Sequence, residues 1–188
     1  STRKGKSKVL MIKDISDLKA KLEHILVSNQ GCFKSGKVAN YIPALAEVPG
    51  DLAGVAVATI DGKLVSAGNG DLPFSIQSIS KVFGLVLAMN RLGDELWQRV
   101  HMEPSGQPFN SIIQLEWEKG IPRNPVINAG ALLVSDVLVS HYSASKLSFV
   151  NFMRTLANDD SIHIDHAVYE SELEHGSRNA ALAYLMKS

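Results

Sequence analysis

Ser78 and Lys81 combine two side chains that can carry nucleophilic chemistry, at a spacing typical of one helical turn. They lie in residues 74–81, where polar turn residues give way to a long apolar run. Side chains three positions apart on a helix share a face, so the Ser78 hydroxyl and the Lys81 amine can meet. Burial disfavours a protonated amine, and a neutral lysine can activate a neighbouring serine. The pattern predicts a serine hydrolase that uses lysine in place of histidine.

The Ser-x-x-Lys spacing alone is a weak signal, because it recurs in this chain. It also occurs at Ser1, Ser16 and Ser143. Ser16 and Ser143 begin amphipathic stretches, where serine is typical of a helix cap and lysine of a solvated side chain. Only the run after Ser78 is apolar almost all round, which predicts a helix buried at the centre of its domain. The alternative is a capped core helix in which Lys81 extends its amine to the surface.

The composition is that of an ordinary globular protein. Of the 188 residues, 45% are apolar and 20% are charged, with 19 basic and 19 acidic side chains. This balance gives no reason to expect binding to nucleic acid or to a membrane surface. The single cysteine, Cys32, excludes an internal disulfide, and no apolar run is long enough to span a bilayer. We expect a flexible arm over residues 1–13 and, without an export signal, a cytoplasmic protein.

The elements that position Ser78 and Lys81 are predicted by periodicity and turn residues. Residues 14–27 have helical spacing, residues 29–36 resemble a loop, and residues 38–46 are expected to hold a short helix. Residues 51–67 predict a β-hairpin, with Asp61-Gly62 at its turn. Beyond the Ser78 helix, which Gly93 is expected to end, further helices are predicted over residues 111–119, 129–140, 145–158, 165–174 and 177–187. One hairpin cannot bury so many helical faces, so we expect the sheet to be incomplete in this chain.

Five stretches together resemble the bacterial glutaminase family, whose fold is that of serine β-lactamases and penicillin-binding proteins. They are residues 36–43 (GKVANYIP), 74–81 (FSIQSISK), 104–110 (PSGQPFN), 120–131 (GIPRNPVINAGA) and 171–179 (SELEHGSRN). The resemblance runs from Gly36 to Ser188, in the family's order and spacing. It implies an α+β, serine β-lactamase-like fold: a few antiparallel strands and a mainly helical lobe over residues 75–188. Residues 1–188 would then form one incomplete catalytic domain.

The resemblance implies hydrolysis of L-glutamine to L-glutamate and ammonia, without a metal or an organic cofactor. Ser78 matches the family's nucleophile and Lys81 the adjacent base, while Asn128, Glu172 and Asn179 match positions that contact the substrate together with Ser78. A carboxylate such as Glu172 suits the substrate's amine, and a carboxamide can both donate and accept hydrogen bonds. The N–H of Ser78, near a helix N-terminus, suits one half of an oxyanion hole.

The resemblance also implies features that lie outside these residues. Family members continue past the position of Ser188 with the remaining sheet strands, further catalytic and substrate-binding tyrosines and the second oxyanion donor. We therefore expect this chain alone to lack part of the site. The family further implies a homo-oligomer, either a dimer or a tetramer.

Other hypotheses stay open. A penicillin-recognising serine hydrolase, such as a DD-peptidase or an esterase, shares the serine–lysine chemistry, although residues 124–130 (NPVINAG) count against it. An inactive fragment that acts only in oligomerisation is a second alternative. His163 and His166 suggest a metal site, but Asp165 between them is typical of a helix cap that would separate them, so no metal is expected. Cys32 is interpreted as incidental to the chemistry.

Overall fold

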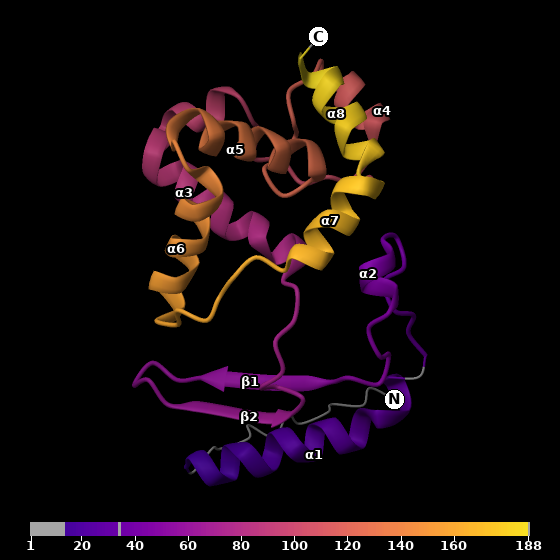
Figure 1. The fold of residues 1–188 in the computed structure, drawn as a ribbon, viewed down its shortest axis with the longest axis vertical. Coiled ribbons are helices and arrows are strands. Elements are labelled where there is room, and N and C mark those ends of the chain that lie inside the picture. The colour runs from indigo at the N-terminus through magenta and orange to yellow at the C-terminus, as the bar shows by residue number, and fades with distance from the viewer. Residues whose placement is uncertain (1–13, 34, 188) are drawn as a thin grey trace, which may run out of the picture. The chain divides into compact units, whose positions relative to one another are not determined.

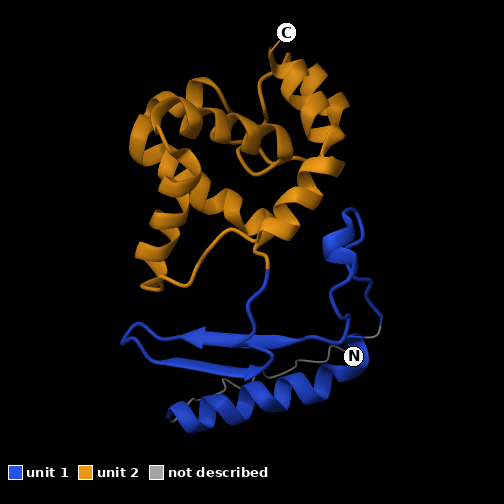
Figure 2. Cartoon of the chain, in the orientation of Figure 1, with its two compact units in different colours: residues 1–74 blue, residues 75–188 orange. Residues whose placement is uncertain are grey.

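The computed structural model describes residues 14–33 and 35–187, and the chain divides into two compact units (Figure 2). Unit 1 comprises residues 1–74 and unit 2 residues 75–188. The flexible arm expected over residues 1–13 lies outside the described residues. No helix in the described ranges has both the length and the apolarity that a bilayer-spanning helix requires.

Unit 1 is built on a β-hairpin with a helix along one face (Figure 1). Strands β1 (Gly54–Ala58) and β2 (Leu64–Gly68) pair antiparallel, which confirms the hairpin predicted over residues 51–67. Gly62 follows Asp61 in the turn and has a φ of +84°, a conformation that glycine adopts without steric cost. The predicted turn chemistry therefore determines where the hairpin reverses.

The core of unit 1 lies between this sheet and helix α1 (Ile15–Phe33). Val65 and Ala67 are two positions apart on β2 and point to the same face, where they pack against Leu18 and Leu22 of α1. All four side chains are buried. The apolar residues that recur every four positions on α1 thus pack against those that recur every two positions on β2.

Helix lengths in unit 1 differ from those that the sequence indicates. Helix α1 continues to Phe33, through residues that were expected to form a loop. Its exposed last turns are supported by side chains that bond to the preceding turn: Ser28 donates to the carbonyl of His24, and Asn29 Nδ2 donates to that of Ile25 at 2.7 Å. Helix α2 is limited to Pro43–Ala46, because proline is favoured only in the first turn of a helix.

Unit 2 consists of helices. A 3₁₀ turn, η1 (Gln77–Ile79), runs directly into helix α3 (Ser80–Leu92), so the predicted Ser78 helix begins as a tighter turn. The remaining elements are η2 (Gly93–Gln98), α4 (Ile112–Trp117), α5 (Asn128–His141), α6 (Ser145–Ala157), α7 (His166–His175) and α8 (Ser177–Lys187). These α-helices confirm the predicted ones to within a few residues at their ends. The 3₁₀ helix η2 was not predicted; Gly93, with a φ of +57°, ends α3 there.

Helix α3 is buried on one side and exposed on the other. Leu87 and Ala88 belong to a core that α3 shares mainly with α5. Val82, Val86 and Met89 are 52%, 41% and 40% exposed. The expectation that this helix is enclosed all round is therefore wrong for the described structure, because the helices that pack against it, α5 and α6, do not surround it (Figure 1).

A second core in unit 2 joins α4, α5 and α8. Its buried members are Leu115, Ile127, Ala129 and Leu182. Ile127 and Ala129 are only 6% and 2% exposed, and they flank Asn128 in the sequence. The backbone on both sides of Asn128 is therefore held by apolar packing.

Candidate active site

Lys81 begins a chain of hydrogen-bonded side chains in unit 2. Its Nζ donates to the backbone carbonyl of Val126 at 3.1 Å and to Oδ1 of Asn128 at 2.8 Å. Nδ2 of Asn128 in turn donates to Oδ1 of Asn179 at 3.1 Å. Helices α3, α5 and α8 supply one side chain each. The structure thus brings together Lys81, Asn128 and Asn179 from distant parts of the sequence.

The surroundings of Lys81 weaken its hold on a proton. Burial lowers the pKa of Lys81, because the charged ammonium loses hydration. The Phe109 ring opposes this effect only weakly, because its centroid lies 6.0 Å from Nζ, at the outer limit of a cation–π contact. A lysine whose pKa is lowered has a larger neutral fraction near neutral pH, and only the neutral amine can accept a proton. The position is therefore suited to a general base.

Ser78 is exposed, whereas the residues on both sides of it are held in place. Gln77 has a φ of +44°, a left-handed conformation that is uncommon for a residue other than glycine. Its Nε2 donates to Ser75 Oγ at 2.9 Å, and its carbonyl accepts from Ser80 Oγ at 2.6 Å. Neither the hydroxyl nor the N–H of Ser78 donates a hydrogen bond to another described residue. Both groups can therefore donate a further hydrogen bond.

Two expected site residues, Ser78 and Glu172, are not hydrogen-bonded to the Lys81–Asn128–Asn179 chain among the described residues. Lys81 directs its amine to Val126 and Asn128, and the described residues include no hydrogen bond from it to Ser78 Oγ. Glu172 lies half-buried on α7, where its carboxylate pairs with no described cation. The structure therefore places Ser78 and Glu172 in unit 2 without linking them to the Lys81 amine.

The histidines near α7 make only local contacts. Asp165 caps α7 by accepting the N–H of Val168 at 3.1 Å, which confirms the predicted cap. His163 Nδ1 lies 2.7 Å from the carbonyl of Ser161, and His175 Nδ1 lies 2.9 Å from that of Ser171. In the described ranges, no cluster of three or more His, Cys, Asp or Glu side chains has a geometry that could hold a metal ion.

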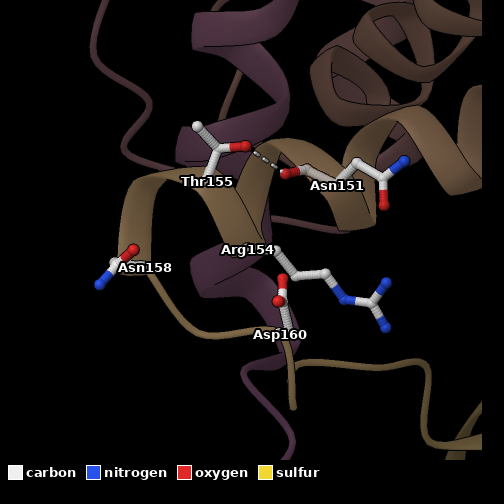
Figure 3. Close-up of a pocket in the computed structure, with 5 residues that line it drawn as sticks. All are labelled: Asn151, Arg154, Thr155, Asn158 and Asp160. Atoms are coloured by element: carbon white, nitrogen blue, oxygen red, sulfur yellow. Dashed lines mark hydrogen bonds between the residues drawn. The ribbon is translucent and has the colours of Figure 1, made fainter.

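A polar pocket of about 460 Å³ lies at the C-terminal end of α6 (Figure 3). It is lined by Asn151, Arg154, Thr155, Asn158 and Asp160. Arg154 Nε donates to the carbonyl of Ile162 at 2.7 Å, and Thr155 Oγ1 donates to that of Asn151 at 2.9 Å. Asn158, with a φ of +50°, ends the helix in the left-handed conformation. These contacts serve the helix end, and the lining contains none of the expected site residues.

Two contributors to the site act partly or wholly through the backbone, and side-chain patterns did not reveal them. Val126 contributes its carbonyl to Lys81. Phe109 contributes its ring and also its carbonyl, which accepts the N–H of Asn128 at 2.8 Å. The available signal was indirect, because both residues lie in stretches on which the resemblance rests.

Comparison with known proteins agrees with that resemblance. A sequence model of the family described as Glutaminase matches residues 36–188. The glutaminase of Yersinia pestis bv. Antiqua (strain Nepal516) is 56% identical over 170 residues, which cover 90% of this chain and 55% of that protein. The glutaminase of Cronobacter sakazakii (strain ATCC BAA-894) is 59% identical over 154 residues, covering 81% of this chain and 50% of that protein.

A solved structure extends the comparison to the fold. The probable glutaminase from Bacillus subtilis complexed with 6-diazo-5-oxo-L-norleucine matches with a TM-score of 0.76 and 33% identity, covering 94% of this chain and 53% of that one. The chain spans about half the length of the curated relatives that it matches. The α+β fold of the described residues is thus that of the corresponding part of a glutaminase. The family match covers most of the sequence, and the chain belongs to the glutaminase family.

Proposed function

We propose that the protein hydrolyses the side-chain amide of L-glutamine to L-glutamate and ammonia, through an ester on Ser78 with Lys81 as the adjacent base. Membership of the glutaminase family supports the reaction. The observation that carries the proposal is the chain of contacts from Lys81 through Asn128 to Asn179. It connects a lysine whose pKa is lowered by burial to two residues expected to bind the substrate.

In the proposed reaction, the neutral Lys81 amine accepts the proton of the Ser78 hydroxyl while Oγ attacks the amide carbon. The N–H of Ser78 donates to the oxyanion of the tetrahedral intermediate. Collapse of the intermediate breaks the carbon–nitrogen bond, and the proton held by Lys81 passes to the departing ammonia. Water then attacks the glutamyl ester while Lys81 accepts its proton. The bond from the acyl carbon to Oγ breaks, the proton returns to Ser78 Oγ, and glutamate is released.

Recognition of glutamine requires groups for its ammonium and its carboxylate. Glu172 is the proposed partner of the ammonium, because its half-buried carboxylate pairs with no described cation. Asn179 uses its Oδ1 to accept from Asn128, and its Nδ2 donates to no described residue. That amide group therefore remains available to a substrate carboxylate or carbonyl. No metal or organic cofactor is required by this chemistry.

The test is glutamate release together with intact mass after incubation with 6-diazo-5-oxo-L-norleucine, the compound bound in the Bacillus subtilis relative. We expect one adduct on Ser78 and none in Ser78→Ala. Ser143→Ala is the matched control, since Ser143 also precedes a lysine by three positions and is exposed, but it lies just before α6, outside the Lys81 contacts. Glutamate release that persists in Ser78→Ala would exclude the proposed nucleophile.

The alternatives are separated by two further measurements. The chain should be assayed alone and after extension with the part of the Yersinia pestis glutaminase that it does not cover. Activity only in the extended protein would mean that this chain alone is an inactive fragment. A fluorescent penicillin that labels Ser78, with no release of glutamate, would favour the penicillin-recognising hydrolase. The cytoplasmic location and the dimer or tetramer stay predictions, and sedimentation of the purified protein tests the latter.

A further inference from the structure

We propose that Asn124 is a positioning residue, whose side chain holds the segment 126–128 so that Val126 and Asn128 can bind the Lys81 amine. Among the described residues, no hydrogen bond joins Asn124 to Lys81, and Asn124 is proposed to act through its neighbours. The effect of Asn124 on catalysis rests on the proposed glutaminase reaction. Its effect on the position of the Lys81 amine does not depend on that proposal.

Both polar atoms of the Asn124 carboxamide, Oδ1 and Nδ2, form hydrogen bonds with backbone groups. Oδ1 accepts the N–H groups of Val126 and Ile127, both at 3.1 Å. Nδ2 donates to the carbonyl of Glu103 at 2.9 Å. One side chain therefore ties the segment after Pro125 to a separate stretch of the chain, with two acceptor bonds on one side and one donor bond on the other.

The tied segment supplies both acceptors of the Lys81 amine. The Val126 carbonyl lies 3.1 Å from Nζ, and Oδ1 of Asn128 lies 2.8 Å from it. Because a peptide unit is planar, fixing the N–H groups of Val126 and Ile127 fixes the orientation of the Val126 carbonyl between them. The N–H of Asn128, at the other end, is held by the Phe109 carbonyl at 2.8 Å. The segment is thus fixed at each of its peptide groups.

The main chain of Asn124 is also in close contact with α5. A Cβ atom on Gly130 would lie 1.9 Å from the Asn124 carbonyl oxygen and 2.7 Å from Cα of Pro125. The first turn of α5 therefore rests directly on these two residues, and only a glycine permits that approach. Asn124 is held on its side-chain face by Glu103 and on its backbone face by α5. Its position is consequently coupled to the helix that carries Asn128.

The geometry requires asparagine in particular, because one terminal group must accept two hydrogen bonds and the other must donate one. Asn124→Ala removes all three bonds. Asn124→Asp keeps an oxygen for the Val126 and Ile127 N–H groups but places the second carboxylate oxygen against the Glu103 carbonyl, where both atoms are acceptors. The substitutions should therefore act in a graded order, with alanine more disruptive than aspartate.

The direct test is the chemical reactivity of the Lys81 amine, measured by competitive acetylation across pH with mass spectrometry of the labelled peptide. The pH titration gives two quantities: the pKa of Lys81 and the acetylation rate of its fully neutral amine at high pH. The second quantity, the limiting rate, reports how strongly the surrounding groups hold and shield the amine. In Asn124→Ala we expect this rate to rise about three- to tenfold, the equivalent of losing hydrogen bonds of ordinary strength. Asn124→Asp should give a smaller rise.

The matched control is Asn69→Ala, which removes an asparagine bond of the same kind from unit 1, where Oδ1 accepts the N–H of Ala53 at 3.1 Å. It should leave the reactivity of Lys81 unchanged. A folded Asn124→Ala or Asn124→Asp protein whose Lys81 reacts at the original rate would overturn the proposal. Should the alanine variant fail to fold, the aspartate variant decides.

Activity supplies a second readout in the extended protein. Loss of Lys81 positioning should lower kcat more than it raises KM, because the base acts in the chemical step. A purely structural role would instead lower the amount of folded enzyme at constant kcat per folded molecule. If Lys81 reactivity rises as expected but no version forms glutamate, the positioning role is supported and the proposed function fails.

Discussion

Nζ of Lys81 lies 2.8 Å from Oδ1 of Asn128, although the two residues are 47 positions apart in the sequence. Lys81 is in the first turn of α3, and Asn128 is the first residue of α5. The two helices pack through a shared core that includes Leu87 and Val137. The distance between the Lys81 amine and the Asn128 carboxamide is therefore set by helix packing.

Replacing Asn128 tests the consequence of this contact. Asn128→Asp would place a carboxylate beside the Lys81 amine, and an opposite charge at that distance favours the protonated form and raises its pKa. The neutral base would become scarcer at neutral pH. We expect kcat/KM for glutamine to fall by about a hundredfold or more in the extended protein and its pH profile to move to higher pH.

The matched control for that change is Asn151→Asp, because Asn151 is exposed on α6 and lies outside the Lys81 contacts. Its pH profile should be that of the unmodified protein. An Asn128→Asp profile that does not move would mean that Lys81 is not the titrating base.

The lowered pKa of Lys81 has a consequence for stability as well. At pH values between the folded pKa and the ordinary lysine pKa, the unfolded state binds more protons than the folded state, so the free energy of unfolding rises with pH. The contribution is fully present above the unfolded pKa and is lost as pH falls through the folded pKa. Urea unfolding of the unmodified protein and Lys81→Met should therefore show the unmodified protein gaining stability relative to the variant as pH rises above neutral. A difference independent of pH would mean that burial does not shift this pKa.

Much of the fold could be predicted from the sequence, because strong local signals marked it. Asp61-Gly62 specified the hairpin turn, and Asp165 specified the start of α7. The end of α1 was missed because Ser28 and Asn29 extend the helix through side-chain bonds to the backbone, which leave no apolar period. The exposed side of α3 was missed because composition does not tell which faces of an apolar helix find partners.

In the candidate site, side chains could be predicted from the sequence, whereas backbone contributions could not. Lys81, Asn128 and Asn179 carry polar side chains, whose types could be matched to a family pattern. The Val126 carbonyl has no such signature, since any residue presents one. Asn124 lay in one of the matched stretches, but the sequence indicated no role for it. Its proposed role depends on the N–H groups of Val126 and Ile127 that its oxygen accepts in the folded chain.

Gly130 offers a test of the close approach between α5 and the segment before it. In Gly130→Ala the new Cβ would meet the Asn124 carbonyl oxygen at 1.9 Å, and the neighbouring atoms are all backbone, which cannot rotate away. We expect a loss of at least about 1–3 kcal/mol in the free energy of unfolding. Gly31→Ala, in α1, has no atom within 4 Å of the new Cβ.

The Gly31 variant should instead gain about 0.4–1 kcal/mol, because alanine restricts the unfolded chain and has a higher helix propensity than glycine. Both values come from chemical denaturation of the purified proteins. Equal effects of the two substitutions would show that α5 can move away from Asn124 at little cost.

Leu182 tests how firmly α8 holds Asn179. Leu182 is 0% exposed in the core that joins α4, α5 and α8, and it lies one helical turn after Asn179. Leu182→Ala should lower the free energy of unfolding by about 2–5 kcal/mol, because it leaves a cavity. Leu173→Ala on α7, where the side chain is 70% exposed, should cost no more than about 0.5 kcal/mol. Denaturation curves measure both, and similar losses for the two leucines would mean that α8 is not anchored through Leu182.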